Sequence, residues 1–275
     1  MQFHHFSPDG ELRDARRVSD DRVSNLAAVV RTPDGWLAAQ QEGLTGQSRD
    51  NPGPYRDTTT IRRFHLSSSI SEPIARFAGR ETYLLGEIGF YIYPFRAPVP
   101  QVVIGRDARI YFTGGDKYRI DVHAFDGSGS GDGAPGPTLV RRITGEVDRV
   151  PMTDAEYEAD YRAQLARYED RRPLQGEAAM AHAMLVNEYP SVPGAQFVPV
   201  VGRMLVDEDG RILLERLDLE PVAWDLLAAD GRIAGRVRLP YPFTPRRLTP
   251  RHLYGVLRDE LDVQYVVRYR LRPAI

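Results

Sequence analysis

Short turns built on Asp-Gly pairs divide this sequence at regular intervals. Residues 223–239, AWDLLAADGRIAGRVRL, alternate between apolar and other residues, break at Asp230-Gly231, and then resume the alternation. The same punctuation appears in residues 4–15 (HHFSPDGELRDA), 29–40 (VVRTPDGWLAAQ) and 203–217 (RMLVDEDGRILLERL). Alternation with a period of two is typical of β-strands, and glycine tolerates the positive φ that a tight hairpin turn requires. The chain is therefore expected to fold mostly into β-hairpins.

The expected hairpins occur in couples along the chain. Turns near residues 107 and 126 form one couple, and turns near residues 209 and 230 form another. Each couple predicts a four-stranded antiparallel meander, whose strands are called A to D in chain order. The expected meanders cover residues 27–78, 101–145 and 198–239, with a partial unit at 246–272 and a leading remnant at 1–18.

Tandem meanders of this kind are typical of a β-propeller. A single twisted meander exposes two apolar faces, and stacking such blades around an axis buries both of them. We therefore expect an all-β fold in which residues 1–275 form a single, partial propeller domain of about four to five four-stranded antiparallel blades. Residues 2–18 would add an outer strand to the C-terminal unit and make a mixed closing blade. The alternative is that leading blades are missing from this chain.

Three long insertions interrupt the hairpin pattern, at residues 42–58, 79–98 and 147–197. Successive connections in an antiparallel meander alternate between the two ends of the strands. The first insertion is a B–C loop and the other two are D–A connections, so all three are expected on one face, over the central channel. We call this surface the loop face. Long connections are often functional, and D–A connections also tolerate insertion well, so both interpretations stay open.

The insertion at 147–197 is expected to be helical. Residues 153–172 begin with Thr153 and Glu156, a pattern typical of a capping box, and a second helix is expected at 178–189. Four apolar and aromatic residues would line one face of the first helix: Tyr157, Tyr161, Leu165 and Tyr168. Such a stripe packs a helix onto the body of a protein more often than it grips a ligand.

Familiar catalytic and metal-binding motifs are absent from the sequence. It contains no HExxH, no P-loop and no GxSxG pattern, and it contains no cysteine. A match to GxGxxG at residues 131–136 leads through Pro137 into an expected strand, whereas a dinucleotide-binding loop must lead into a helix. These observations favour a binding protein over an enzyme, with neither a cofactor nor a metal ion.

Charge and hydropathy exclude two classes of partner. The formal net charge is −2 and the arginines are spread along the chain, so we expect no nucleic-acid partner. No run of 18 apolar residues occurs, so we expect no membrane span. Residues 1–10 lack the basic and apolar regions of a signal peptide. The remaining candidate partners are a protein, a peptide or a glycan.

Six residues are candidates for ligand binding. Three arginines lie on, or at the end of, expected first strands, which line the channel of a propeller, and they could attract an anion. Three tyrosines lie in the first two insertions of the loop face. The candidates are Arg31, Arg106, Arg203, Tyr55, Tyr91 and Tyr93.

Two stretches resemble a known family. Residues 205–235, LVDEDGRILLERLDLEPVAWDLLAADGRIAG, are similar to the repeats of six-bladed β-propellers of the NHL/TolB-like kind. Residues 254–271, YGVLRDELDVQYVVRYRL, resemble the last blade of bacterial six-bladed propellers. The resemblance implies six blades, so this chain would be truncated at its N-terminus or would form a diverged ring. It also implies export to the periplasm or the extracellular space, with the signal peptide lost together with the missing blades.

Two functions therefore stay open. The first is a non-catalytic propeller that binds a protein, peptide or glycan through its B–C and D–A loops. The second, implied by the resemblance, is a divalent-cation-dependent hydrolase of the lactonase or esterase type, with calcium in the central channel. Propeller lactonases use carboxylate and amide ligands, and asparagine is rare here, occurring only at Asn25, Asn51 and Asn187. The first function is the one we predict.

Overall fold

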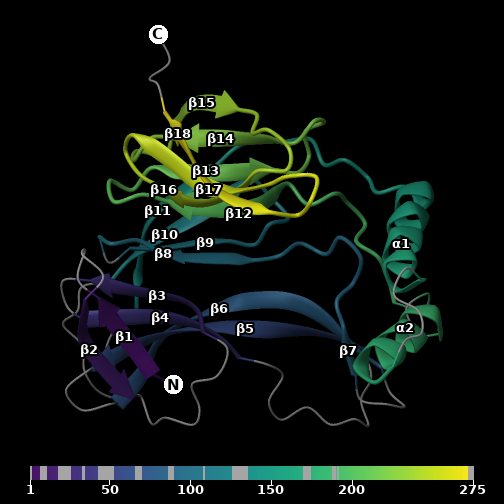
Figure 1. The fold of residues 1–275 in the computed structure, drawn as a ribbon. Coiled ribbons are helices and arrows are strands. Elements are labelled where there is room, and N and C mark those ends of the chain that lie inside the picture. The colour runs from purple at the N-terminus through teal and green to yellow at the C-terminus, as the bar shows by residue number, and fades with distance from the viewer. Residues whose placement is uncertain are drawn as a thin grey trace.

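The computed structural model shows a mostly β protein with antiparallel sheets and two helices (Figure 1). It describes residues 2–6, 11–17, 26–32, 35–42, 53–65, 70–85, 90–107, 109–125, 136–169, 175–187, 190 and 192–271. Within these ranges, neither helix combines the length and the apolar composition needed to cross a membrane.

The described strands form four larger sheets and one hairpin, and strands that are neighbours in a sheet are also consecutive in the chain. The first sheet contains β3 (Leu26–Thr32), β4 (Gly35–Glu42), β5 (Gly53–His65), β6 (Ile70–Leu85) and β7 (Phe90–Ile92). The second contains β8 (Gln101–Ile104), β9 (Arg109–Thr113), β10 (Arg119–Ala124) and β11 (Thr138–Thr144). The third contains β12 (Val201–Val206), β13 (Ile212–Arg216), β14 (Ala223–Leu227) and β15 (Ile233–Val237). The fourth contains β16 (Thr244–Leu248), β17 (His252–Arg258) and β18 (Gln264–Arg270), and the hairpin pairs β1 (Gln2–Phe6) with β2 (Leu12–Arg17). The predicted meanders are confirmed as antiparallel sheets.

The first sheet differs from the predicted four-stranded unit because it has a fifth strand. Strand β5 begins at Gly53, inside the expected loop 42–58, and β6 continues to Leu85, inside the expected connection 79–98. The two strands pair along their length, from His65 opposite Ile70 to Gly53 opposite Leu84. The described residues 53–58 and 79–85 of these insertions therefore extend the sheet, because cross-strand pairing overrides their weak strand pattern.

The hairpin at the N-terminal end also differs from one expectation. Strand β1 pairs with β2, and the fourth sheet consists of β16, β17 and β18 alone in the described part of the chain. Residues 2–6 and 11–17 therefore do not add an outer strand to β18. The expected mixed closing blade is therefore wrong for the described strands, and in Figure 1 the hairpin lies well apart from β16, β17 and β18.

The Asp-Gly turns owe their shape to the aspartate as much as to the glycine. In the β12–β13 turn, the backbone N–H groups of Asp209 and Arg211 donate to Asp207 Oδ1 at 3.0 and 2.8 Å. Gly210 has φ +79°, and Gly231 in the β14–β15 turn has φ +91°. The carboxylate satisfies turn amides and the glycine adopts the left-handed conformation, so each turn is specified by its own few residues.

The four larger sheets stack face to face with apolar layers between them. Leu37 and Ile61 of the first sheet pack with Ile104 and Ile110 of the second. Further layers lie between the second and third sheets, with Ile120 and Met204 among their members, and between the third and fourth, with Trp224 and Leu253. Strands β8, β12 and β16 are each the first strand of their sheet, and in space β12 contacts both β8 and β16. Burial of these layers is the main favourable contribution to this arrangement.

Helices α1 (Asp154–Glu169) and α2 (Glu177–Asn187) lie beside the stack (Figure 1). The capping box is confirmed, because the Thr153 N–H donates to Glu156 Oε2 at 2.8 Å and the Glu156 N–H donates to Thr153 Oγ1 at 3.2 Å. The tyrosine stripe packs inward: the Tyr157 ring lies 5.1 Å from that of Phe95. The Tyr161 hydroxyl donates to the carbonyl of Leu185 at 3.2 Å. The stripe therefore holds the helices together and against the body of the protein.

Candidate functional site

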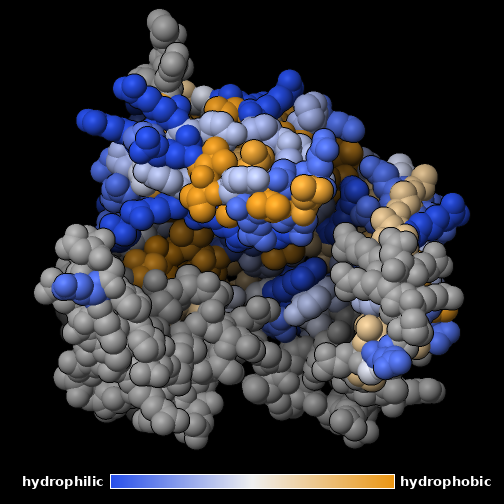
Figure 2. Space-filling view, in the orientation of Figure 1, coloured by the Kyte–Doolittle hydropathy of each residue, from blue (hydrophilic) through white to orange (hydrophobic). Residues whose placement is uncertain are grey.

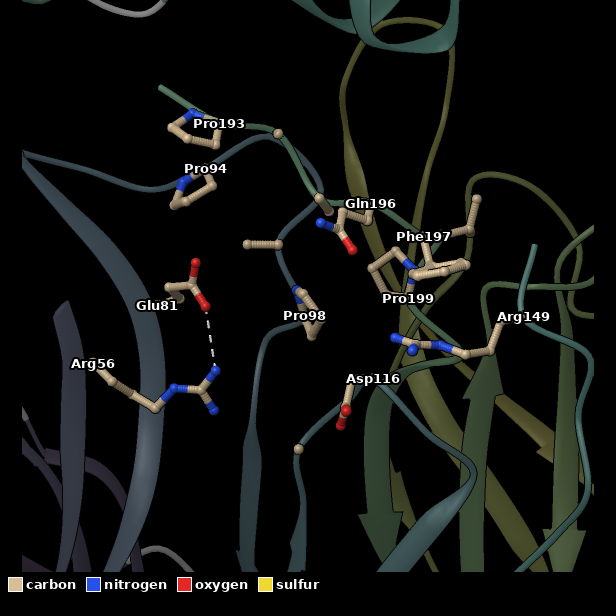
Figure 3. Close-up of a pocket in the computed structure, with 15 residues that line it drawn as sticks. Arg56, Glu81, Pro94, Pro98, Asp116, Arg149, Pro193, Gln196, Phe197 and Pro199 are labelled. Atoms are coloured by element: carbon tan, nitrogen blue, oxygen red, sulfur yellow. Dashed lines mark hydrogen bonds and ion pairs between the residues drawn. The ribbon is translucent and has the colours of Figure 1, made fainter. Parts of the chain in front are cut away.

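A cavity of about 380 Å³ lies on the loop face, where parts of the three predicted insertions meet (Figure 3). The extended ends of β5 and β6 supply Arg56 and Glu81 to one wall. The segment between β7 and β8 supplies Pro94 and Pro98, and residues 193–199, which follow the helices, supply the facing wall. Segments far apart in the sequence thus form one site, as expected if the insertions share a face.

Hydrogen bonds between backbone segments hold these walls together. The Ala195 N–H donates to the carbonyl of Phe95 at 3.2 Å, and the Val198 N–H donates to the carbonyl of Val150 at 2.9 Å. Four lining residues are prolines, whose fixed φ limits backbone motion. They are Pro94, Pro98, Pro193 and Pro199. The cavity is therefore largely preformed, which lowers the entropic cost of binding a ligand.

One wall carries an ion pair. Arg56 Nη2 lies 3.3 Å from Glu81 Oε2, across the paired strands β5 and β6 (Figure 3). Both side chains are half exposed, so the pair contributes little to folding stability. The ion pair instead fixes the positions of both groups, so that a guanidinium and a carboxylate lie side by side at the rim of the cavity.

The opposite wall carries two charges that are not paired with each other. Arg149 places its guanidinium over the ring of Phe197, with Cζ 4.0 Å from the ring centroid. Asp116 lies in the turn between β9 and β10 and also lines the cavity (Figure 3). Among the described residues, neither Asp116 nor Arg149 has a salt-bridge partner within 4.0 Å. Their hydrogen-bonding groups are available to a ligand.

A second cavity, of about 680 Å³, shares two of its lining residues with the first. Asp116 and Arg149 line both cavities, so they stand where the two join. The second cavity adds Lys117 and Glu146 and runs along the ends of the second and third sheets. The linings of the two cavities carry charges of both signs, and we call the two cavities together the groove.

The buried residue Tyr118 lines the second cavity and contacts an ionic network of the third sheet. Burial, together with the negative charge of Asp225, raises the pKa of Tyr118 to about 12. The Tyr118 ring lies under the guanidinium of Arg216, with Cζ 4.8 Å from the ring centroid. A tyrosine with a raised pKa stays protonated at neutral pH, so this group supports the groove and is not a general base there.

The six sequence-predicted residues do not gather at one place. Tyr55 and Tyr93 lie next to the cavity residues Arg56 and Pro94, and the Tyr93 ring stacks on the guanidinium of Arg80 at 3.8 Å. Arg106 lies in the turn after β8, at the end of the sheet opposite to the loop face.

The other three predicted residues lie on strands. Arg203 is exposed on β12, and its backbone N–H donates to Glu215 Oε2 at 2.9 Å. Arg31 lies on β3 and Tyr91 lies on β7, and the positions of their side chains are outside the described part of the chain. None of the six lines either part of the groove.

Sequence reasoning missed the four charged residues of the first cavity: Arg56, Glu81, Asp116 and Arg149. Three of the four adjoin or lie within the insertions that were expected on the loop face, and Asp116 lies in the B–C turn on the same face. The insertions were thus a usable signal for location. The sequence could not predict which residues line the cavity, because the lining depends on how the β5–β6 extension and residues 193–199 approach each other.

Metal ligands do not gather in this part of the protein. Within the residues that the structure describes, histidine, aspartate and glutamate side chains do not come together in groups of three that could hold an ion.

Comparisons with known proteins give little further information. No protein-family model matches the chain, and no curated protein matches it. A solved structure of a 6-phosphogluconolactonase-like protein from Bacteroides uniformis ATCC 8492 aligns with 88% of this chain and 84% of its own, at 9% sequence identity and a TM-score of 0.24. At that TM-score the likeness carries no argument about fold or activity.

Proposed function

We propose that this chain is a non-catalytic binding protein that holds an extended peptide segment in the groove on its loop face. The observation that carries this proposal is the position of Asp116 and Arg149, which line both cavities and have no ion-pair partner among the described residues. Two cavities that share lining residues can hold neighbouring side chains of one extended peptide, whereas a compact small molecule would occupy only one of them. A guanidinium stacked on an aromatic ring keeps its N–H edge free to bind a carboxylate.

Peptides fit the groove better than the other predicted ligand classes. Glycans commonly stack a sugar ring on an open aromatic face. Here the guanidinium of Arg149 stacks on the Phe197 ring and that of Arg80 stacks on the Tyr93 ring. A peptide instead offers side chains of both charges, which suit the carboxylates and guanidinium groups of the groove. The groove therefore favours a peptide with one acidic and one basic residue close together.

We also infer that the stacked sheets belong to a β-propeller. The support is that the first strands β8, β12 and β16 lie next to one another while each sheet packs face to face on the next. Neighbouring inner strands of this kind are typical of blades arranged around an axis. In that arrangement the groove lies at the loop-face end of the blades.

Selection from a displayed library of random peptides tests the binding proposal. Peptides that bind the protein are then measured against the double variant Asp116→Asn, Arg149→Gln, and we expect affinity to fall by at least about tenfold. The matched control removes the exposed pair of Glu158 and Arg162 on α1, 2.8 Å apart, with the variant Glu158→Gln, Arg162→Gln. Peptides that bind the groove variant as tightly as the parent protein would overturn the proposal.

A melting experiment separates this function from the hydrolase alternative. A calcium-dependent hydrolase should melt at a higher temperature when calcium is added, and a chelator should reverse the change. We expect the melting temperature to be the same with calcium and with chelator. A reversible increase would favour the hydrolase and argue against a metal-independent binding protein.

A further inference from the structure

The fourth sheet has two chemically different faces. One face packs on the third sheet and includes Leu253, Val267 and Tyr269, which join Trp224 in an apolar cluster. Because strand residues alternate between faces, the residues between these point to the other side of the sheet. That other side includes Arg247, His252, Tyr254, Val256, Arg258, Gln264, Val266, Arg268 and Arg270, and we call it the open face.

Cross-strand pairing gathers the basic residues of the open face. Tyr254 on β17 is opposite Arg247 on β16 and Arg268 on β18, which makes a row of arginine, tyrosine and arginine. In the adjacent row His252 is opposite Arg270. Side chains directly opposite in antiparallel strands lie within contact distance, so three guanidinium groups share a small area.

Carboxylates do not balance these charges. Residues 244–271 contain six arginines, whereas their three acidic residues all lie in the β17–β18 turn, at positions 259, 260 and 262. Within the described chain, no salt bridge within 4.0 Å involves Arg247, Arg268 or Arg270. Clustered like charges without counter-charges oppose folding, and such clusters are suited to binding an anionic partner.

In the second and third sheets, arginines of the outer strand are paired with aspartates of the neighbouring strand. On the second sheet, Arg142 of the outer strand donates to Asp121 of the neighbouring strand at 2.7 Å. On the third sheet, Arg236 of the outer strand donates to Asp225 at 2.6 Å. In the fourth sheet, neither the outer strand β18 nor its neighbour β17 carries an acidic residue. Its arginines therefore lack the internal partners that the other two sheets provide.

Exposed apolar side chains lie beside the basic rows. Val266 lies in the row next to Tyr254 and Arg268 and is 84% exposed. Leu261 and Val263 lie in the β17–β18 turn and are 84% and 46% exposed. Figure 2 shows hydrophobic surface in the region where the fourth sheet lies in Figure 1, next to hydrophilic side chains. Arginine and tyrosine side chains are enriched at protein–protein interfaces, and on the open face Tyr254 lies between two arginines.

We propose that the open face of the β16–β18 sheet is a docking surface for an acidic polypeptide that also carries aliphatic side chains. Its carboxylates would pair with Arg247, Arg268 and Arg270, and its aliphatic side chains would cover Val266. The charge complementarity of these arginines with an acidic chain selects this occupant. The proposal does not depend on the peptide groove, which is built from other segments of the chain.

Two other occupants fit the surface less well. A second copy of the chain would bring two arginine-rich faces together, and like charges across an interface disfavour association. A nucleic acid would gain from the arginines, but it would leave exposed Val266 and Leu261 without a matching apolar partner. The partner is therefore expected to be a protein.

Charge reversal tests the proposal with a defined probe. A fluorescein-labelled peptide of sequence EVEVEVE should bind the protein in an anisotropy titration, and the variant Arg268→Glu, Arg270→Glu should bind it at least about tenfold more weakly. A peptide of sequence KVKVKVK should show the opposite preference and bind the reversed variant better than the parent protein. This exchange of preference requires direct contact, and a merely unstable variant would not produce it.

Controls and rival outcomes decide the interpretation. The matched variant Arg232→Glu, Arg238→Glu places the same charge change on the exposed residues that flank β15, and it should leave binding of EVEVEVE within about twofold. The variant Val266→Ser should weaken binding without changing its dependence on salt. The proposal is wrong if EVEVEVE fails to bind or if both reversed variants bind it equally. It is also wrong if a single-stranded oligonucleotide binds the open face more tightly than EVEVEVE does, or if the parent protein self-associates through this face in sedimentation experiments.

Discussion

Arg216 and Asp225 form a buried ion pair between β13 and β14, with Nη1 2.8 Å from Oδ2. Their side chains are 7% and 0% exposed. Arg216 also binds Asp218 at 2.7 Å, and Asp225 also accepts a hydrogen bond from Arg236 at 2.6 Å. The pair therefore lies at the centre of a network that contacts Tyr118 of the groove, and it links strands of the third sheet to the interface with the second.

Removing one charge from this network should strongly destabilise the protein. The variant Asp225→Asn leaves Arg216 buried without its full set of counter-charges, and breaking such a pair costs about 3–5 kcal/mol. Denaturant unfolding monitored by circular dichroism measures the free energy of unfolding. The control Asp230→Asn alters an exposed pair with Arg232 and should leave the midpoint nearly unchanged. Equal effects from the two variants would contradict the role of the network.

Acid should weaken the fold through the same aspartate. Burial raises the pKa of Asp225, but hydrogen bonds from Arg236 and Arg216 outweigh this effect, and the pKa lies below its usual range. A carboxyl whose folded-state pKa is depressed stabilises the protein above its unfolded-state pKa, about 3.9 for aspartate, and this stability is lost as the pH falls toward the folded-state value. Unfolding midpoints should therefore fall below about pH 4. The decrease should be smaller in Asp225→Asn, and an equal decrease would assign it to other carboxyls.

Two tyrosines should make the fold sensitive to alkali. Burial is the main cause that raises the pKa of Tyr111 and of Tyr118 to about 12. A tyrosine with a raised pKa contributes stability that is fully present below the unfolded-state pKa of about 10, and this stability decreases as the pH rises toward the folded-state value. Ultraviolet titration should show two tyrosines that ionise late, and Tyr118→Phe should remove one of them. Ionisation of every tyrosine near the unfolded-state value would contradict this prediction.

A methyl group at Gly255 should disrupt the apolar layer between the third and fourth sheets. An added Cβ would lie 2.3 Å from Cζ of Phe243 and 2.4 Å from the carbonyl oxygen of Thr244. Overpacking of this kind costs about 1–3 kcal/mol, so Gly255→Ala should lower the melting temperature. Gly235→Ala is the matched control, because a Cβ there meets nothing within 4 Å. A normal melting temperature for Gly255→Ala would show that β17 can shift to accommodate the methyl group.

Local patterns were sufficient to predict most of the secondary structure. The turn at Asp207–Gly210 is specified by side chain–backbone hydrogen bonds within five residues, and the capping box of α1 by bonds within four. Such features depend on neighbours in the sequence, so period-two alternation and capping patterns predict them. The extension of β5 and β6 was missed because its strand signal is weak and the pairing partner supplies the stabilisation.

The sequence by itself determined a mostly β chain of antiparallel meanders with a helical insertion. Only the tertiary structure decided where a ligand can bind, because Arg56, Asp116 and Arg149 are brought together by contacts between segments up to 93 residues apart. It also decided that the arginines of β16 and β18 share one uncovered face. Hydrogen bonds in a turn are local, whereas a groove or an open sheet face exists only after distant segments have packed, and that is the physical reason for the division.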